Sequence, residues 1–533
     1  MQLSQEEKQV GRENFYNAVG ATRRDFLHAS MAAVPAGAAY TAYSSQKYFN
    51  YGSLQGGPVR AALIGSGDEG NILLTQSNPD YMQFVAYSDI RPSQIKRTRD
   101  GDPNSRHRVG FLRKYEMTQQ QFEKEIQFEA DYKKLLENPD IEVVVIALPL
   151  HLHYQAVMDA LDAGKHVLCE KLMAHNVTQC KEMARKAEEK GLFLAIGHQR
   201  HYSVLYDNAV SIIENDLLGD IQHIRARWHR NNSWPRLDDG KNPIVDEGGA
   251  PVLYDSWSKA IPQIDREIDF DAYGYQSLKE LVRWRLYDRT GGGLMAELGS
   301  HQLDACSIFL GKVRPIAVSG TGGKYFYEDD REVEDHVYVT LEFPGYDHPQ
   351  GKKVGGNEKD IVVVTYSSIN TNSLDGYGEQ VIGTRGSMFV EKEQEVMLYA
   401  ERAPGRRNQP RETEVTVATS GKGQPVLETA ESPGSGPAAA GLAKATLSEE
   451  VSRGYREEME HLAWCIRNLD STDSRARQEL RCRPEVALAD AVYALTANIA
   501  IRQARRIEFK PEWFDTQDPA APETDPELRV TQA

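Results

Sequence analysis

The sequence predicts an α/β protein: an N-terminal Rossmann domain with a doubly wound parallel sheet, then a C-terminal α/β domain with an open, mainly antiparallel sheet. Three observations support this prediction. A glycine turn, Gly65-Ser66-Gly67-Asp68-Glu69-Gly70, lies between a short apolar run and a helix-compatible stretch. β-prone and helical segments alternate up to Gly197, as in parallel sheets. From Ile221 onward apolar residues alternate with polar ones, as in an antiparallel sheet with one covered face.

The size and composition of the chain suit a soluble protein of more than one domain. Its 533 residues exceed what one hydrophobic core usually supports. The net charge of −16 repels phosphates and argues against nucleic-acid binding. No uninterrupted apolar stretch reaches the length of about 18 residues that spans a bilayer. The five cysteines form no CxxC pair, so neither a disulfide framework nor a zinc site is expected. Cys169 and Cys306 lie in apolar runs and are expected to be buried, inert thiols.

Residues 1–58 are interpreted as an export signal and linker. The segment Thr22-Arg23-Arg24-Asp25-Phe26-Leu27 precedes a weakly apolar, alanine-rich stretch from Met31 to Tyr43. This arrangement resembles a twin-arginine export signal. We therefore expect the twin-arginine export machinery as a partner and a periplasmic or other extracytoplasmic location. Cleavage after the small residues near Ala38, cleavage near Ser44 and retention as an anchor are all left open.

Residues 59–200 are predicted to bind a dinucleotide. The strand Val59–Ile64 leads into the glycine turn, whose glycines permit a tight turn and let the backbone approach a pyrophosphate at the helix N-terminus. Asp89 ends the second strand, at about 20 residues beyond the turn, where the adenosine ribose hydroxyls are bound. A carboxylate there favours NAD, because it repels a 2′-phosphate. Arg91 keeps NADP possible, because an arginine can bind that phosphate.

Further strands are predicted over 141–148, 166–170 and 192–196, with one helix over 153–163 and another between the last two strands, up to about residue 190. A long helix is predicted over 118–138. Residues 201–513 form the second predicted domain, with strands over 221–228, 313–320, 336–343, 360–367 and 377–382 and helices over 449–468 and 484–506. Within it, residues 402–446 contain few large apolar side chains and are expected to be disordered. The acidic tail, residues 514–533, is expected to be loose.

Four separated motifs resemble, in order, those of the Gfo/Idh/MocA oxidoreductases. They begin at Ala147, Cys169, Gly197 and Gly291 and read ALPLHLH, CEKL, GHQRHY and GGGLMAELGSH. The resemblance covers about residues 59–400 and a C-terminal helix. It implies a nicotinamide-dependent oxidoreductase that transfers hydride from a CH–OH group of a sugar, cyclitol or related polyol. We also expect a homo-oligomer.

The resemblance assigns roles to three residues. Lys171, in the Glu170-Lys171 pair, would touch a substrate hydroxyl and the nicotinamide ribose, although Leu172 stands where the family has proline. His301 matches the catalytic histidine, and Glu297 stands where the family has aspartate. Removal of hydride from a secondary alcohol needs a group that accepts the hydroxyl proton, and a lysine or histidine of suitable pKa can do so. Positions i and i+4 share a helix face, so Glu297 is predicted to orient His301 or to bind a substrate hydroxyl.

The predicted site is larger than these three catalytic residues. The predicted cofactor-binding residues are Gly65, Ser66, Gly67, Asp68, Glu69, Gly70, Asp89, Leu148, Pro149, His153, Glu170, Lys171, Gln199 and Arg200. The predicted substrate-binding residues are Lys171, Arg200, Trp228, Asn231, Asn232, Trp234, Glu297 and His301. No metal is expected, because the His151-Leu152-His153 pair has no cysteine or carboxylate nearby in sequence to complete a site.

Export sharpens the functional prediction. A cofactor loaded before export cannot be exchanged with a free NAD pool, so it is expected to stay tightly bound and to be restored in each cycle. The principal prediction is an oxidoreductase with tightly bound NAD(P). An alternative is a glycoside hydrolase or lyase that works by oxidation, elimination and re-reduction without net redox change. A lesser alternative is a non-catalytic carbohydrate-binding protein, which retention of Lys171 and His301 disfavours.

Overall fold

A computed structural model describes residues 3–18, 52–230, 233–235, 242–245, 248–401, 415–419, 425–429 and 453–529. The predicted export signal, residues 22–43, lies outside the described residues, as do Asn231 and Asn232.

The N-terminal sheet has six parallel strands in the order β3-β2-β1-β4-β5-β6. Its strands are β1 (Val59–Ile64), β2 (Met82–Ser88), β3 (Gln127–Glu129), β4 (Val143–Ile146), β5 (His166–Glu170) and β6 (Leu194–Gly197). The strand order reverses between β1 and β4, and ligands bind outside the carboxyl ends of the strands at such a point. The predicted doubly wound domain is thus confirmed.

Helices cover both faces of this sheet, and one of them comes from the far end of the chain. The helices from the N-terminal half are α4 (Asp68–Gln76), α5 (Pro92–Asp100), α6 (Gly110–Lys114), α7 (Gln119–Glu125), α8 (Tyr132–Leu136), α9 (His153–Asp162) and α10 (Val177–Lys190). α14 (Tyr455–Asn468) packs against α4, β1 and β2, where Met459 and Leu462 join the same buried cluster as Leu63. The Rossmann unit is therefore completed by residues beyond the predicted boundary at 200.

The second sheet has eight strands in the order β15-β14-β13-β7-β12-β11-β10-β18. Its strands are β7 (Ile221–His229), β10 (Ala317–Gly323), β11 (His336–Pro344), β12 (Ile361–Ile369), β13 (Tyr377–Gly383), β14 (Gly386–Glu391), β15 (Glu395–Ala400) and β18 (Ile507–Glu508). Every neighbouring pair is antiparallel except β7 and β12, which are parallel. Burial alternates along β12, where Val362, Val364 and Tyr366 face the core. The prediction of a mainly antiparallel sheet is confirmed.

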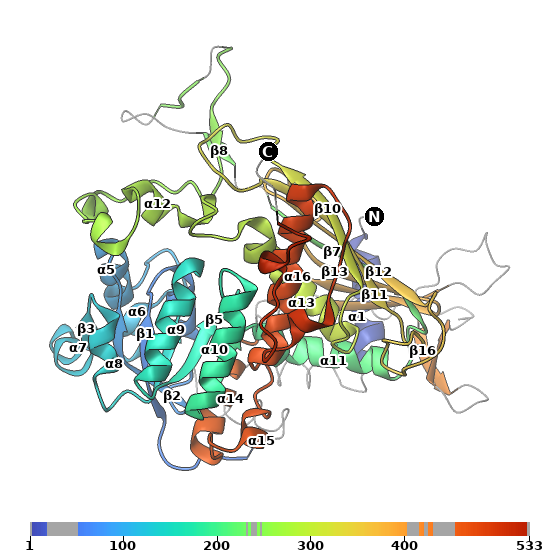
Figure 1. Cartoon of the computed structure of the whole chain (residues 1–533), viewed down its shortest axis with the longest axis horizontal. Helices are drawn as coiled ribbons and strands as arrows, with labels where there is room; N and C mark the ends of the chain where they lie inside the picture. The colour runs from blue at the N-terminus through green and yellow to red at the C-terminus, as the bar shows by residue number, and fades with distance from the viewer. Residues whose placement is uncertain are drawn as a thin grey trace.

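α16 (Pro484–Gln503) lies between the two sheets (Figure 1) and packs against β10, α10 and α13 (Ser300–Phe309). Among the described helices it alone is long and apolar enough to cross a membrane, yet 72% of its apolar window is buried inside the protein. It is a core helix that joins the domains. Three further helices are α11 (Val204–Glu214), α12 (Leu278–Val282) and α15 (Ser474–Arg477).

The prediction of a single long helix over 118–138 is wrong. The segment contains α7, the edge strand β3 and α8. Thr118 begins α7 with a capping box, and Asp131 begins α8 by accepting a hydrogen bond from Lys133 N. Two N-cap residues thus start two short helices, and the residues between them pair with β2.

The 402–446 segment, predicted to be disordered, includes a described hairpin of β16 (Val415–Thr419) and β17 (Pro425–Thr429). The expectation of a loose tail is wrong for the described part, residues 514–529. The ammonium group of Lys181, a residue 1% exposed, donates to the carbonyl oxygens of Glu512, Asp518 and Ala520. Leu528 is also buried. All five cysteines are buried, which confirms the prediction made for Cys169 and Cys306.

An N-terminal helix, α1 (Gln5–Ala18), was not predicted from the sequence and packs against β15. Phe15 is 1% exposed. Asn14 Nδ2 donates to the carbonyl oxygen of Leu398 at 2.9 Å, and Tyr399 Oη donates to that of Glu7 at 2.7 Å. The segment before the paired arginines is therefore part of the folded second domain.

Candidate dinucleotide and substrate site

The glycine turn brings the backbone close to neighbouring elements and leaves the start of α4 open. Gly65 has φ +86°, and a Cβ on it would lie 2.5 Å from the carbonyl oxygen of Ala147. A Cβ on Gly70 would lie 2.2 Å from the carbonyl oxygen of Gly65. Gly67 is the N-cap of α4 and supplies no side-chain cap. The first N–H groups of the helix therefore have room for an anionic acceptor such as a pyrophosphate.

Asp89 is fixed at the end of β2 by the glycine turn itself. Ser66 donates to Asp89 Oδ2 from its backbone N at 2.8 Å and from its Oγ at 3.1 Å. The backbone N of Arg91 donates to Asp89 Oδ1 at 2.8 Å. Ser66 is fully buried, so it supports the predicted cofactor site by holding Asp89 and does not line the cleft.

Arg91 is the residue that kept NADP binding possible, and it is bound by an acid that is distant in the sequence. Its Nε and Nη2 donate to Asp265 Oδ2 at 3.1 and 2.9 Å. The same carboxylate accepts hydrogen bonds from Ser93 N and Ser93 Oγ, and Asp265 is 0% exposed. The charge of Arg91 is thus already compensated, which favours NAD over NADP at this ribose.

The two acids in the glycine turn are offset by basic side chains. Burial opposes ionisation of Asp68, but its ion pairs with Lys259 and Arg97 hold its pKa below the ordinary value. Burial raises the pKa of Glu69, although Lys171 and Arg285 oppose the shift. These charges make the acidic turn compatible with a bound pyrophosphate.

Lys171, Glu297 and His301 line one cavity of 620 Å³ together with the glycine turn. Lys171 follows β5, and its Nζ donates to the carbonyl oxygen of Glu297 at 3.1 Å. His301 lies in the first turn of α13, is 8% exposed and packs against Trp228 at 5.5 Å between ring centroids. The structure thus brings the three predicted catalytic residues to the dinucleotide cleft.

The structure does not support the predicted orientation of His301 by Glu297. Glu297 lies in a π-helical turn, Met295–Gly299, which changes the spacing that an α-helix would give positions i and i+4. Its Oε2 accepts a hydrogen bond from Arg285 Nε at 2.7 Å. Asp304, on the next turn of α13, instead binds His201 Nε2 at 2.6 Å. A role of Glu297 at a substrate hydroxyl stays a prediction.

The surroundings of His301 keep its imidazole neutral. Burial lowers the pKa of His301 well below 6.5, and the nearby cationic Lys171 and Arg200 lower it further. A neutral imidazole can accept a proton, whereas the imidazolium cannot.

Glu170 lies beneath Lys171 and contributes to a buried acidic group. Burial, followed by the charge of Glu69, raises the pKa of its carboxyl. Glu458 of α14 carries a similarly raised pKa because of burial and the charge of Glu170. Both carboxylate oxygens of Glu458 lack a hydrogen-bond partner in the part of the chain that the structure describes. The sequence predicted a helix over 449–468, and the structure confirms it as α14, but its packing against the first domain and the position of Glu458 were not predicted.

His153, Leu148 and Pro149 lie where the sequence places them. All three line the cavity. The ring nitrogens of His153 face the carbonyl oxygens of Leu172 and Leu148, each at 2.9 Å. His153 therefore ties the loop after β4 to the loop that carries Lys171.

Arg200 is not at the cleft, contrary to its predicted roles at cofactor and substrate. It is 1% exposed, and its guanidinium binds Glu393 and Gln302 Oε1 and donates to the carbonyl oxygen of His301. Gln199 is also buried and absent from the cavity wall. Arg200 therefore supports the backbone of the predicted catalytic histidine from behind.

The structure describes the side chain of only one of the two tryptophans that are predicted to bind substrate. Trp228 stacks on Tyr377 at 4.6 Å and borders His301 without lining the cavity. The side chain of Trp234 lies outside the part of the chain that the structure describes, and so do Asn231 and Asn232. Their role at a substrate stays a prediction.

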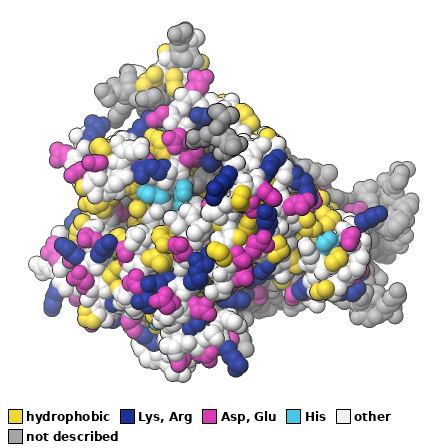
Figure 2. Space-filling view, viewed as in Figure 1, with side chains coloured by type: hydrophobic (Ala, Val, Ile, Leu, Met, Phe, Trp, Pro, Cys, Tyr) yellow, Lys and Arg dark blue, Asp and Glu magenta, His cyan; other side chains and the backbone are white. Residues whose placement is uncertain are grey.

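A segment of the second domain overhangs the cleft, and we call residues 255–285 the strap. In Figure 1 it carries α12 above α5, and Figure 2 shows histidine and basic side chains on the face below it. Its cavity-lining members, which sequence reasoning missed, are Trp257, Lys259, Ala272, Tyr273, Tyr275, Leu281, Val282, Arg283, Trp284 and Arg285. Each end of the strap carries a tryptophan close to a basic residue, and this pattern in the sequence could have identified it.

The strap is fastened to the Rossmann domain by charge and by apolar contact. Asp265 binds Arg91 and Ser93, and Lys259 pairs with Asp68. Tyr275 packs edge-on to His151 at 5.5 Å, and the buried Tyr275 and Leu281 pack with Ile90. The strap therefore closes the dinucleotide cleft from the side of the second domain.

The parallel sheet, the glycine turn and the cleft lined by Lys171 and His301 define a two-domain protein with a Rossmann-type dinucleotide-binding domain. Residues 82–198 match the family model described as "Oxidoreductase family, NAD-binding Rossmann fold", and residues 267–389 match the "GFO/IDH/MocA C-terminal domain". These matches confirm the NAD-binding and C-terminal domains of the Gfo/Idh/MocA family in this chain.

Relatives of known activity cover part of the chain. Trans-1,2-dihydrobenzene-1,2-diol dehydrogenase of Oryctolagus cuniculus is 27% identical over 41% of this chain and 50% of its own length. Inositol 2-dehydrogenase/D-chiro-inositol 3-dehydrogenase of Lactiplantibacillus plantarum is 31% identical over 24% of this chain and 36% of its own length. The chain spans about a third to a half of the length of the curated relatives it matches.

The fold is also similar to a solved structure. Aldose-aldose oxidoreductase from Caulobacter crescentus, complexed with glycerol, has a TM-score of 0.51 and 17% identity, over 85% of this chain and 100% of that chain. The likeness extends across both domains.

Proposed function

We propose that this protein is an NAD-dependent oxidoreductase that removes hydride from a CH–OH group of a sugar, cyclitol or related polyol. One observation carries the proposal: Lys171 and His301 line the same cavity as the glycine turn that fits a dinucleotide. The names of the two curated relatives support the substrate class, because one is a diol dehydrogenase and the other an inositol dehydrogenase.

The charge states of His301 and Lys171 define the role of each residue in the proposed reaction. A nicotinamide ring, when bound, supplies the hydride acceptor. The neutral imidazole of His301 accepts the hydroxyl proton of the substrate. The ammonium of Lys171, held by the Glu297 carbonyl, donates to the same hydroxyl oxygen and stabilises negative charge that develops there.

We further propose that NAD stays bound between turnovers. The strap covers the cleft, and its anchor to Arg91 and Ser93 is buried. A dinucleotide that enters or leaves has to displace these contacts. A retained cofactor requires that each cycle return it to its starting state, by reduction of a second substrate or by re-reduction of the first.

Export by the twin-arginine route, with an extracytoplasmic location, is part of the proposal. The basis is the Arg23-Arg24 segment and the following apolar stretch. Because α1 precedes these arginines and packs on β15, cleavage after them would separate α1 from the rest of the chain. We therefore favour retention of the segment over cleavage. The expected homo-oligomer stays a prediction.

The test begins with the full chain as purified. Denaturation should release about one dinucleotide per chain, as expected for one site of this kind. Addition of a panel of sugars, cyclitols and polyols should produce absorbance at the reduced-nicotinamide band in a single turnover. Lys171→Ala and His301→Ala should abolish that signal, whereas Lys359→Ala, at an exposed lysine that does not line the cavity, should retain it.

A redox-neutral glycoside hydrolase or lyase is the second candidate, and the strap is the observation that favours it. Hydrolysis of a glycoside without net NADH, lost in Lys171→Ala and His301→Ala, would replace the first proposal with this one. Binding of sugars without absorbance change or product would support the non-catalytic carbohydrate-binding alternative. Release of no dinucleotide on denaturation would contradict tight binding.

A further inference from the structure

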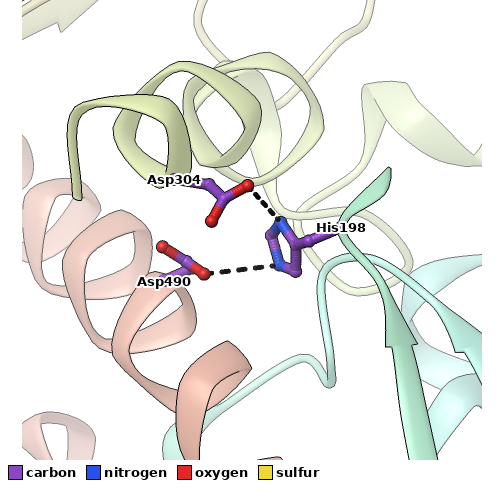
Figure 3. A group of neighbouring side chains, drawn as sticks. All are labelled: His198, Asp304 and Asp490. Atoms are coloured by element: carbon purple, nitrogen blue, oxygen red, sulfur yellow. Dashed lines mark ion pairs between the residues drawn. The ribbon is translucent and has the colours of Figure 1, made fainter. Parts of the chain in front are cut away.

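Three buried polar side chains from distant segments meet behind the cleft (Figure 3). His198 follows β6, Asp304 lies on α13 and Asp490 lies on α16. The three residues are 0%, 1% and 2% exposed, respectively. His198 Nδ1 lies 3.8 Å from Asp304 Oδ2, and His198 Nε2 lies 3.9 Å from Asp490 Oδ2. These distances are too long for direct hydrogen bonds.

The cluster leaves several buried polar atoms unsatisfied. Both ring nitrogens of His198, together with Asp304 Oδ2 and Asp490 Oδ1, have no hydrogen-bond partner among the described residues. The other oxygen of Asp304 accepts from His201 at 2.6 Å. Buried polar groups normally have partners, because leaving one unpaired costs free energy. Several such atoms facing one another indicate a missing shared partner.

We propose that His198, Asp304 and Asp490 hold one divalent first-row metal ion, with Zn²⁺ the best match. One imidazole nitrogen and two carboxylate oxygens are ligands that Zn²⁺ accepts. Their donor atoms all lie within 4.8 Å of one another. Two bonds of about 2.1 Å to one ion span at most about 4.2 Å, so binding draws the side chains slightly inward. A fourth ligand would be water.

The chemistry of the three side chains favours a cation over a shared proton. Two buried carboxyl groups face an imidazole, and a divalent ion can bind one oxygen of each together with one ring nitrogen of His198. A proton shared by Asp304 and Asp490 would leave both nitrogens of His198 without a partner. Of these two occupants, the cation alone binds all three residues at once.

The site would position the catalytic machinery and not touch the substrate. None of the three residues lines the dinucleotide cavity. Asp304 lies one turn after His301 on α13, so an ion there links α13 to the end of β6 and to α16. This site was not predicted from the sequence, because its ligands come from three distant segments and do not include the His151 and His153 pair.

The test measures metal bound to the full chain. We expect elemental analysis of the dialysed protein to find about one zinc ion per chain, as for a structural site. Co²⁺ added after chelation and dialysis should give visible absorption bands of a cobalt site with nitrogen and oxygen ligands. Asp490→Asn should reduce bound zinc at least about tenfold, because it removes a charged ligand, and should lose the cobalt bands. Glu485→Gln, an exposed acid on the same helix, should retain both.

The thermal midpoint supplies a readout that does not depend on a folded variant. Chelator should lower the midpoint of the wild type by several degrees, and added ZnCl₂ should restore it. Wild-type protein that binds no stoichiometric Zn²⁺ or Co²⁺ and shows no midpoint shift would overturn the proposal in favour of a shared proton. Equal zinc in Asp490→Asn and Glu485→Gln would also overturn it.

Discussion

Release of the cofactor should depend on Asp265, which lies on the strap and touches neither the nicotinamide side of the cleft nor the predicted catalytic residues. Its carboxylate accepts four hydrogen bonds, two from Arg91 and two from Ser93. The Asp265 side chain is 0% exposed and that of Arg91 is 17% exposed, so water screens the pair weakly. Asp265→Asn keeps the shape of the side chain but removes its charge.

The size of the effect follows from these contacts. Removal of one partner from a buried ion pair costs about 3–5 kcal/mol, and the asparagine oxygen can still accept from Ser93. A loss of about 2–3 kcal/mol in strap closure is therefore expected. The Lys259–Asp68 pair contributes less, because the side chain of Lys259 is 49% exposed and exposed pairs are worth little. At about 1.4 kcal/mol per tenfold, NAD should leave Asp265→Asn about 30- to 140-fold faster.

The assay follows dissociation directly. Protein loaded with NADH is mixed with a large excess of NAD, and the decay of bound-NADH fluorescence gives the release rate. Glu267→Gln, an exposed acid two residues along the strap, is the matched control and should behave as wild type. If Asp265→Asn folds normally and releases NADH as slowly as Glu267→Gln, the strap does not retain the cofactor. Fast release from the wild type would refute the same reasoning.

Four further results are expected. The Kd for NADP relative to NAD should fall about tenfold in Asp265→Asn, because a freed Arg91 can pair with the 2′-phosphate; an unchanged ratio would show that Asp89 alone sets the preference. Lys171→Ala should lower the single-turnover rate by about 10²–10⁴-fold while its NAD content equals that of Lys359→Ala. The acid limb of kcat/KM should lie below pH 6.5, since burial lowers the pKa of His301 and its neutral form is the active one; a limb above that pH contradicts its role. Burial lowers the pKa of His151 and His166 to about 4. The stability that their neutral forms contribute above pH 6.5 should therefore be lost as the pH falls through 4. A melting midpoint that stays flat from pH 7 to 4 would contradict this.

Features that depend on neighbouring residues were predictable from the sequence. The glycine turn, Asp89 and Lys171 each follow a strand directly, and parallel strands place their carboxyl ends at one edge of the sheet. The sequence therefore located the dinucleotide end of the cleft. His301 also came from a local motif, and the structure brings it to the same cavity.

Features that depend on distant pairing were not predictable in this way. Arg91 is held by Asp265 and Arg200 by Glu393, in each case across the two domains or between distant elements. A motif match gave Arg200 a place at the ligand, but the structure shows a guanidinium whose donors are already occupied. Likewise, the apolar face of α14 completes the first domain although the helix lies near the end of the chain.

The contact with the strap explains why a glutamate, and not the shorter aspartate, suits position 297. Its Oε2 reaches Arg285 at 2.7 Å, and an aspartate would be shorter by about one C–C bond of roughly 1.5 Å. Arg285 is the last residue of the strap, and the carbonyl oxygen of Glu297 holds Lys171 Nζ. Strap, catalytic helix and lysine are therefore linked in series through Glu297. We therefore expect Glu297→Asp to lose the contact with Arg285 and to weaken the link between the strap and Lys171.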